Sequence, residues 1–105
     1  MLFIETPIFT EDVESHLSPD SYRALQQALV FRPNAGSVIP GTRGLRKLRW
    51  RSDSGGKRGG LRVVYFWIKD EETIYLLTVY PKTRQDDLTP QQLKILSRLV
   101  REEFP

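Results

Sequence analysis

The most constraining feature of the sequence is the run Leu61–Ile68, in which β-branched and aromatic residues dominate and the only charge is Arg62, near the start. Residues of these types favour β-strands. Because the run is apolar at both odd and even positions, both of its faces need to be buried, which is typical of a strand in the middle of a sheet. We therefore predict a central strand over Leu61–Ile68, with Arg62 at its mouth.

A basic glycine-rich stretch leads directly into this strand. Residues 55–60 read Gly-Gly-Lys-Arg-Gly-Gly, so Lys57 and Arg58 lie between two pairs of glycines. Glycine keeps the backbone permissive and lets a cation approach an anion without a neighbouring Cβ in the way. The stretch lacks the spacing of a Walker loop, and we do not predict a nucleotide site there.

Charge is distributed unevenly along the chain. Residues 1–42 carry two basic and five acidic residues, residues 43–69 nine basic and one acidic, and residues 70–105 five basic and seven acidic, which gives net charges of −3, +8 and −2. Concentrated like charge destabilises a compact state, so the basic middle calls for an explanation. We predict a face that binds a polyanion, most commonly nucleic acid; the alternative is a solvated strand pair rich in arginine.

Composition excludes several classes of protein. The 105 residues include no cysteine and one histidine, so disulfides are absent and a zinc or iron-sulfur site is not expected. No apolar run approaches the roughly 18 to 20 residues of a membrane span, and the N-terminus lacks the pattern of a signal peptide. We predict one cytoplasmic domain over residues 1–105, with no metal, no cofactor and no membrane association.

The first third of the chain predicts one short strand and two helices. Residues 2–5 are apolar enough for an edge strand, which Pro7 ends. Thr10 is expected to cap a short first helix. Ser18 followed by proline predicts the start of a second helix with one apolar face, and Pro33 stops it.

The remainder predicts three or four strands and a last helix. Residues 45–51 alternate so that one face is mostly cationic, and residues 73–80 are again rich in strand-forming types; with the central strand they form an antiparallel meander. Thr89, proline and a glutamine three residues after the threonine predict the last helix. The order β-α-α-β-β-β-α indicates an α+β domain with helices packed on a small antiparallel sheet.

Lys, Arg and Tyr are the side chains that remain as candidates for chemistry, and this set suits one reaction. RNA can be cleaved with its own 2′-hydroxyl as nucleophile, so a protein needs to supply only positioning, charge stabilisation and proton transfer. Arginine binds phosphate oxygens through two parallel hydrogen bonds, and a lysine held near other cations has a lowered pKa and can take a proton near neutral pH. The same side chains can also simply bind RNA, and a non-catalytic RNA-binding module is the alternative.

Five motifs together resemble one family. They are Gly44–Arg49, Gly56–Gly60, Arg62–Tyr65, Tyr75–Tyr80 followed by Lys82, and Asp87–Thr89. In combination they resemble the HigB branch of the RelE-type toxins, within the RelE/ParE superfamily of type II toxin–antitoxin systems. The resemblance implies a RelE-like fold and a ribosome-dependent mRNA endonuclease that enters the A site, cleaves the mRNA there by 2′-hydroxyl attack and inhibits translation.

The resemblance also implies roles for individual residues. Arg62 matches an arginine expected to stabilise the phosphate charge, and Lys57 and Lys82 match further basic positions of the catalytic site. Tyr80 takes the place of a tyrosine that some relatives carry in the last helix, which is absent here. The residues expected to bind RNA are Arg46, Lys47, Arg49, Arg58 and Arg84.

The partners implied by the resemblance are the ribosome and an antitoxin. The toxin would meet mRNA in the A site of the 30S subunit. A HigA-like helix-turn-helix antitoxin would neutralise it, and operator DNA would be bound only through that complex. A ParE-like inhibitor of DNA gyrase is the alternative within the superfamily, and it would not require Arg62, Lys57 and Lys82 to converge.

Overall fold

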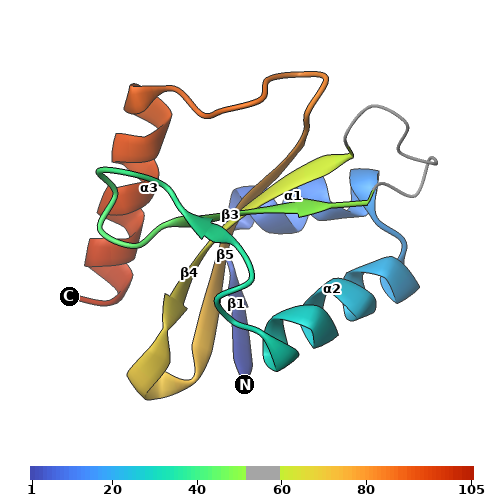
Figure 1. Ribbon diagram of the computed structural model, residues 1–105, viewed down its shortest axis with the longest axis horizontal. Helices are drawn as coiled ribbons and strands as arrows, with labels where there is room; N and C mark the ends of the chain where they lie inside the picture. The colour runs from blue at the N-terminus through green and yellow to red at the C-terminus, as the bar shows by residue number, and fades with distance from the viewer. Residues whose placement is uncertain (52–59) are drawn as a thin grey trace.

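The computed structural model describes residues 1–51 and 60–105 (Figure 1). The elements in order are β1 (Leu2–Glu5), α1 (Pro7–His16), α2 (Pro19–Phe31), β2 (Ser37–Val38), β3 (Arg46–Trp50), β4 (Leu61–Ile68), the 3-10 turn η1 (Lys69–Glu71), β5 (Thr73–Pro81) and α3 (Pro90–Glu103). The predicted α+β class is confirmed. Within the described ranges, no helix is both long enough and apolar enough to cross a membrane.

The five strands form one sheet in the order β1-β5-β4-β3-β2. β4 is the central strand, as predicted, and its antiparallel pairing with β3 and β5 confirms the meander. The sheet is nevertheless mixed rather than antiparallel throughout, because β1 pairs with β5 in parallel. Parallel neighbours require a crossover rather than a hairpin, and no local pattern reveals which strands a crossover joins. The two-residue strand β2 lies outside the segments for which the sequence predicts strands.

The first helix begins earlier than predicted. α1 starts at Pro7 with Thr6 as its N-cap, whose hydroxyl accepts a hydrogen bond from the amide of Phe9 at 3.0 Å. Thr10, the residue expected to cap it, lies inside the helix, and its hydroxyl donates to the Thr6 carbonyl at 3.2 Å. Proline is tolerated at the first helical position because its missing N–H is not needed there, so Pro7 opens the helix in addition to ending the strand.

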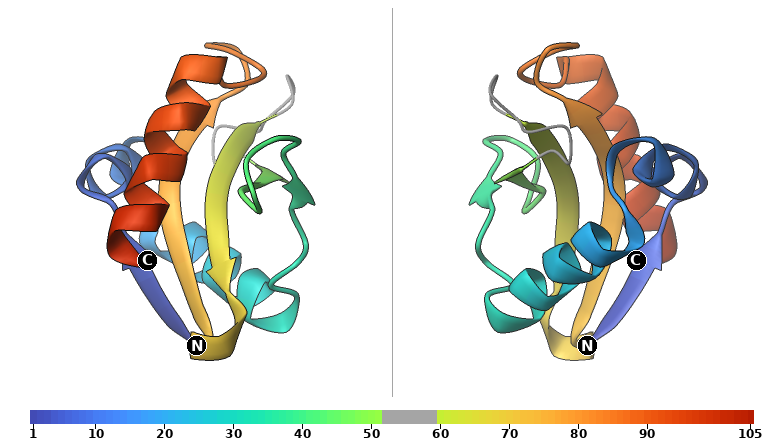
Figure 2. Two further views of the ribbon diagram at one scale, coloured as in Figure 1. Left: turned by 90° about the vertical axis from the view of Figure 1, so that its left-hand side faces the viewer. Right: turned by 90° about the vertical axis from the view of Figure 1, so that its right-hand side faces the viewer.

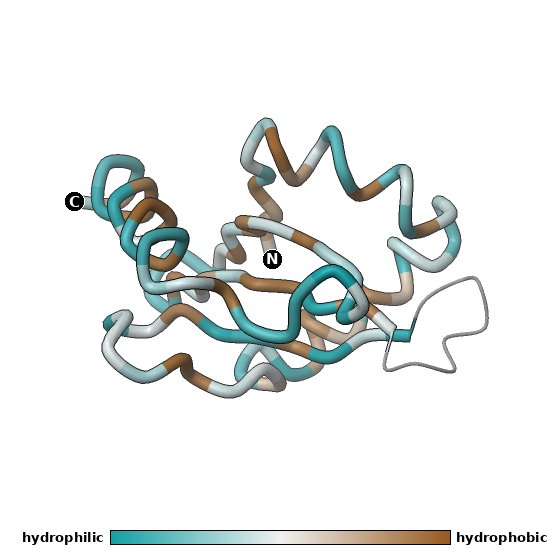
Figure 3. The backbone as a smooth tube through the Cα atoms, turned by 90° about the horizontal axis from the view of Figure 1, so that it is seen from above, coloured by the Kyte–Doolittle hydropathy of each residue, from teal (hydrophilic) through white to brown (hydrophobic). Residues whose placement is uncertain are grey.

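The other two helices begin where the sequence predicts. Ser18 caps α2 and Thr89 caps α3, and each is followed by proline. Gln92 completes a capping box with Thr89, because its side chain accepts a hydrogen bond from the Thr89 amide at 2.8 Å. α2 ends at Phe31, ahead of Pro33, as expected. Figure 3 shows hydrophobic residues recurring between hydrophilic ones along the helices, which is the pattern of helices with one buried face.

Helices cover both faces of the sheet. The two views of Figure 2 show α3 on one side of the sheet and α2 on the other. The core under α1 and α2 includes Leu61, Val63 and Tyr65 of β4, whereas the core under α3 includes Val64. Because side chains alternate along a strand, Arg62 shares the α3 face with Val64. The candidate site therefore lies on the α3 face, near the end of β5.

Candidate anion-binding site

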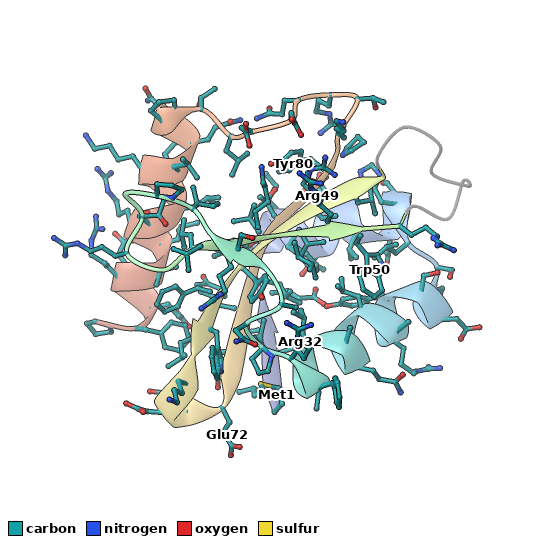
Figure 4. All side chains as sticks on the ribbon, in the orientation of Figure 1. Met1, Arg32, Arg49, Trp50, Glu72 and Tyr80 are labelled. Carbon is teal, nitrogen blue, oxygen red and sulfur yellow. The ribbon has the colours of Figure 1, made fainter. Side chains whose placement is uncertain are left out.

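Three of the predicted site residues form a row across the sheet. Arg49 of β3, Arg62 of β4 and Tyr80 of β5 are direct cross-strand partners. Directly opposed residues point to the same face, so the three side chains share the α3 face, and Lys47 joins them two residues along β3. Figure 4 shows Arg49 and Tyr80 on one side of β3 and Trp50 on the other. The strand register thus brings together residues from three separate segments.

Arg62 lies in the middle of the row and is almost completely buried. Its side chain is 3% exposed, and its Nη2 forms an ion pair with Oδ1 of Asp86 at 3.2 Å. Nη1 lies 3.4 Å from the carbonyl oxygen of Leu61. Asp86 belongs to the connection between β5 and α3 and is itself 59% exposed on its side chain, so it covers the guanidinium from the solvent side. Arg62 lies near the start of the central strand, as predicted, but it is a buried cation, whereas the sequence indicated a position outside the core.

Tyr80 contacts the same aspartate. Its hydroxyl donates to the backbone carbonyl of Asp86 at 3.3 Å, and the residue is 4% exposed. Burial raises the pKa of Tyr80, and the negative charge of Asp87 adds to the rise, whereas Arg62 opposes it. The phenol consequently stays protonated at neutral pH, which is the form that can donate a proton.

Lys47 completes a second ion pair with the same connection. Its ammonium contacts Oδ1 of Asp87, and its side chain is largely covered whereas that of Asp87 is mostly exposed. The hydrogen bond and charge of Lys47 hold the pKa of Asp87 below its usual range. The sequence predicts neither Asp86 nor Asp87 as a site residue, although Asp87 belongs to the motif Asp87–Thr89. The sequence does show two adjacent carboxylates shortly after the end of β5, next to Lys82 and Arg84. It does not show their partners, because Arg62 and Lys47 are distant in sequence.

The remaining predicted residues lie around the row or outside it. Lys82 and Arg84 are exposed on the β5–α3 connection, and neither side chain forms an ion pair within the described residues. Arg46 points to the opposite face, where its Nη1 donates to the Gly36 carbonyl at 2.8 Å. Its expected contact with RNA stays a prediction. Lys57 and Arg58 lie outside the described residues.

A small hollow adjoins the row. Its volume is about 140 Å³, and it lies between the segment around β2 and the start of α3. Lys47, Tyr80 and Asp87 contribute to its wall. The other lining residues are mostly apolar: Ser37, Val38, Ile39, Pro40, Leu88 and Leu93. An anion held by the row can therefore place an attached apolar group beside it. Among the described residues, no group of three or more acidic, histidine or cysteine side chains is arranged to hold a metal ion.

No protein-family model matches the sequence, but solved structures with a similar fold include two of an E. coli toxin. A mutant of the E. coli toxin RelE in the free state is 16% identical, with a TM-score of 0.56 over 81% of this chain and 86% of its own. The intact E. coli RelBE toxin–antitoxin complex contains a chain that is 14% identical, with a TM-score of 0.55 over 76% of this chain and 94% of its own. The protein therefore has a RelE-like fold.

Proposed function

We propose that this protein is the toxin of a type II toxin–antitoxin system, in the HigB-like branch, and that it is a ribosome-dependent mRNA endonuclease acting in the cytoplasm. The observation that carries the proposal is the row of Arg49, Arg62 and Tyr80, with Lys47 beside it, on a RelE-like fold. Cations and a protonated phenol on one face are the groups that cleavage by the substrate's own 2′-hydroxyl requires.

In the proposed reaction the 2′-oxygen attacks the adjacent phosphorus, and the bond from phosphorus to the 5′-oxygen breaks. The products are a 2′,3′-cyclic phosphate and a 5′-hydroxyl. Arg62 and Arg49 stabilise the extra negative charge on the phosphate in the transition state. Tyr80 supplies a proton to the 5′-oxygen, and a lysine such as Lys82 or Lys57 accepts the proton of the 2′-hydroxyl.

In the absence of substrate, Asp86 neutralises the charge of Arg62. Its carboxylate is bound to Arg62 at 3.2 Å, and its side chain is mostly exposed whereas that of Arg62 is buried. A phosphate that contacts Arg62 therefore has to replace this carboxylate, and the exposed Asp86 can turn toward water when it is released. The ordered A site would favour the exchange by presenting several phosphates to the row at once, which supports a requirement for the ribosome.

Primer extension on an mRNA translated in a cell-free system tests the reaction. Message is incubated with and without the protein, with and without ribosomes, and with the variants Arg62→Ala and Arg62→Lys. We expect cuts only with ribosomes and a loss of roughly 10²- to 10³-fold in cleavage rate for Arg62→Ala, as for removal of a group that stabilises transition-state charge. Arg23→Ala is the matched control, since Arg23 is exposed on α2.

Two results would overturn the proposal. Intact message in every lane argues against an endonuclease, and a DNA supercoiling assay then tests the ParE-like inhibition of gyrase. The second is equal cleavage by the wild type and Arg62→Ala, with thermal unfolding confirming that both are folded. This result would show that Arg62, at the centre of the row, takes no part in cleavage.

The antitoxin is proposed on the basis that RelE is solved in a complex with its antitoxin. We expect a protein encoded next to this one, of the HigA-like helix-turn-helix type, to bind it and suppress cleavage, with operator DNA bound by the complex alone. Co-purification and the primer-extension assay in its presence check this. A neighbouring protein that neither binds nor suppresses would contradict the pairing.

A further inference from the structure

A second hollow lies on the α3 face, beside the first. Its volume is about 400 Å³, and it runs between the loop before β3 and the exposed side of α3. Figure 1 shows this loop beside α3. We call this second hollow the α3 groove. Its lining residues are Pro40, Gly41, Thr42, Arg43, Pro90, Leu93, Lys94, Ser97 and Arg101. The set contains three cations and no acidic residue, so the groove is suited to an anionic partner.

The three cations differ from Lys47 and Arg62 in that no carboxylate of the described residues neutralises them. Arg43, Lys94 and Arg101 are all exposed, and none of them forms an ion pair among the described residues. Lys47 and Arg62, by contrast, are held by carboxylates. The α3 groove can therefore bind a polyanion without first releasing a carboxylate of its own.

The loop presents Arg43 in a constrained backbone conformation. Arg43 has a φ of 60°, in the left-handed region that residues with a side chain seldom adopt. The buried Thr42 holds the loop, because its hydroxyl donates to the Ile39 carbonyl at 2.6 Å and accepts from the Leu45 amide at 3.2 Å. A strained position filled by arginine rather than glycine indicates that the side chain has a use there.

The groove is continuous with the candidate site. Pro40 and Leu93 line both the α3 groove and the smaller hollow beside Lys47 and Tyr80. A nucleic-acid strand that has its phosphate at the row can therefore continue past these two residues into the groove. A chain of regularly spaced phosphates can contact several separate cations at once, whereas a single small anion cannot. This arrangement therefore favours an RNA backbone as the occupant.

We propose that the α3 groove binds the phosphate backbone of RNA through Arg43, Lys94 and Arg101, as a contact additional to the candidate catalytic row. This inference rests on the proposed function in taking RNA as the polyanion. The groove would supply affinity and orientation, whereas the row would carry the chemistry.

Fluorescence anisotropy with a labelled 2′-O-methyl RNA hairpin tests the groove apart from cleavage, since this probe lacks the nucleophilic hydroxyl. The test variant is Arg43→Gln/Lys94→Gln/Arg101→Gln. The matched control, Arg23→Gln/Arg32→Gln/Lys69→Gln, removes the same charge from exposed positions away from the groove. We expect the groove variant to bind at least about tenfold more weakly at 100 mM salt, with the slope of log affinity against log salt reduced by about 2 to 3, and the control to change less than about threefold.

Arg43→Gly separates binding from folding. Glycine adopts a φ of 60° without strain, so this variant should unfold at a higher temperature while binding the hairpin more weakly. Equal losses in the groove variant and the control, or no measurable binding by any of the proteins, would overturn the inference. Wild-type affinity for RNA combined with lost binding of the antitoxin would also overturn it and assign the groove to an acidic protein segment.

The two proposals fail in different ways. If the wild type binds the hairpin through the groove but leaves translated message intact, the endonuclease is wrong and the groove stands. If the wild type cleaves message and the groove variant binds the hairpin as tightly as the control, the groove is wrong and the endonuclease stands.

Discussion

At the scale of residues, two neighbouring aspartates decide the electrostatic state of the candidate site. Asp86 binds Arg62, and Asp87 binds Lys47. The pairs join the basic middle of the sequence to its acidic C-terminal part, which reduces the self-repulsion that the charge distribution indicates. Both aspartates are mostly exposed whereas Arg62 is buried, so a phosphate that displaces Asp86 has to take its place as the partner of the buried guanidinium.

The pKa of Asp87 offers a direct test of its contact with Lys47. We expect a carboxyl NMR titration to place the wild-type midpoint below 3.8, and Lys47→Gln to raise it. Because the folded pKa is depressed, the ion pair stabilises the fold above the ordinary aspartate pKa, and this contribution is lost as the pH falls below about 4 through the folded value. Lys94→Gln serves as the control. An unchanged midpoint in Lys47→Gln would show that the two groups do not interact in solution.

At the scale of elements, Tyr65 of β4 anchors the segment that leads from α2 to β2. Its hydroxyl donates to the Pro33 carbonyl at 2.7 Å and accepts from the Gly36 amide at 2.9 Å. Arg46 of β3 reinforces the anchor through the Gly36 carbonyl. The segment that follows lines both the small hollow and the α3 groove. Hydrogen bonds made by Tyr65, whose ring packs on the α1 and α2 face of the sheet, therefore position the walls of the two hollows on the α3 face.

Tyr65→Phe should therefore destabilise the protein by about 1 to 3 kcal/mol, because it leaves a buried amide and a carbonyl without their partner. Tyr75→Phe is the matched control, since the Tyr75 hydroxyl forms no hydrogen bond within the described residues, and it should cost less than about 0.5 kcal/mol. Urea unfolding of both variants measures the difference. Equal stability of the two variants would contradict the anchoring role of Tyr65.

At the scale of the whole molecule, the sheet separates two cores that stabilise it from opposite sides. Val13 of α1 is 5% exposed in one core, and Val100 of α3 is 7% exposed in the other. Both cores use side chains of β4 and β5, so neither can be lost without exposing an apolar face of the sheet. The protein should consequently unfold as a single cooperative unit.

Val13→Ala and Val100→Ala test this cooperativity. Each substitution should cost about 1 to 2 kcal/mol for the methyl groups it removes from the core. The double variant should lose the sum within about 0.5 kcal/mol, since the two sites do not touch, and should still unfold in one transition. Separate transitions for helix content and tryptophan fluorescence would instead indicate that the two faces unfold independently.

Most of the fold was predictable because its signals are local. The central strand follows from one continuous apolar run, and the starts of α2 and α3 follow from a capping residue and a proline. Thr6 carries the same signal for α1, and we assigned the cap to Thr10 instead. The parallel pairing of β1 with β5 joins residues about seventy positions apart, and no adjacent pattern indicates it.

The residue types of the candidate site were predictable, but the burial and ion pairing of its cations were not. The sequence alone determined the apolar central strand, the position of Arg62 near its start and the concentration of cations between two acidic parts, because these depend on covalent neighbours and on strand periodicity. The same periodicity places Arg46 on the face opposite Lys47 and Arg49. Only the tertiary structure decided that Asp86 pairs with Arg62 and that Asp87 binds Lys47. The two ion pairs join residues 24 and 40 positions apart, and burial and pairing over such separations depend on strand register and on the path of the β5–α3 connection.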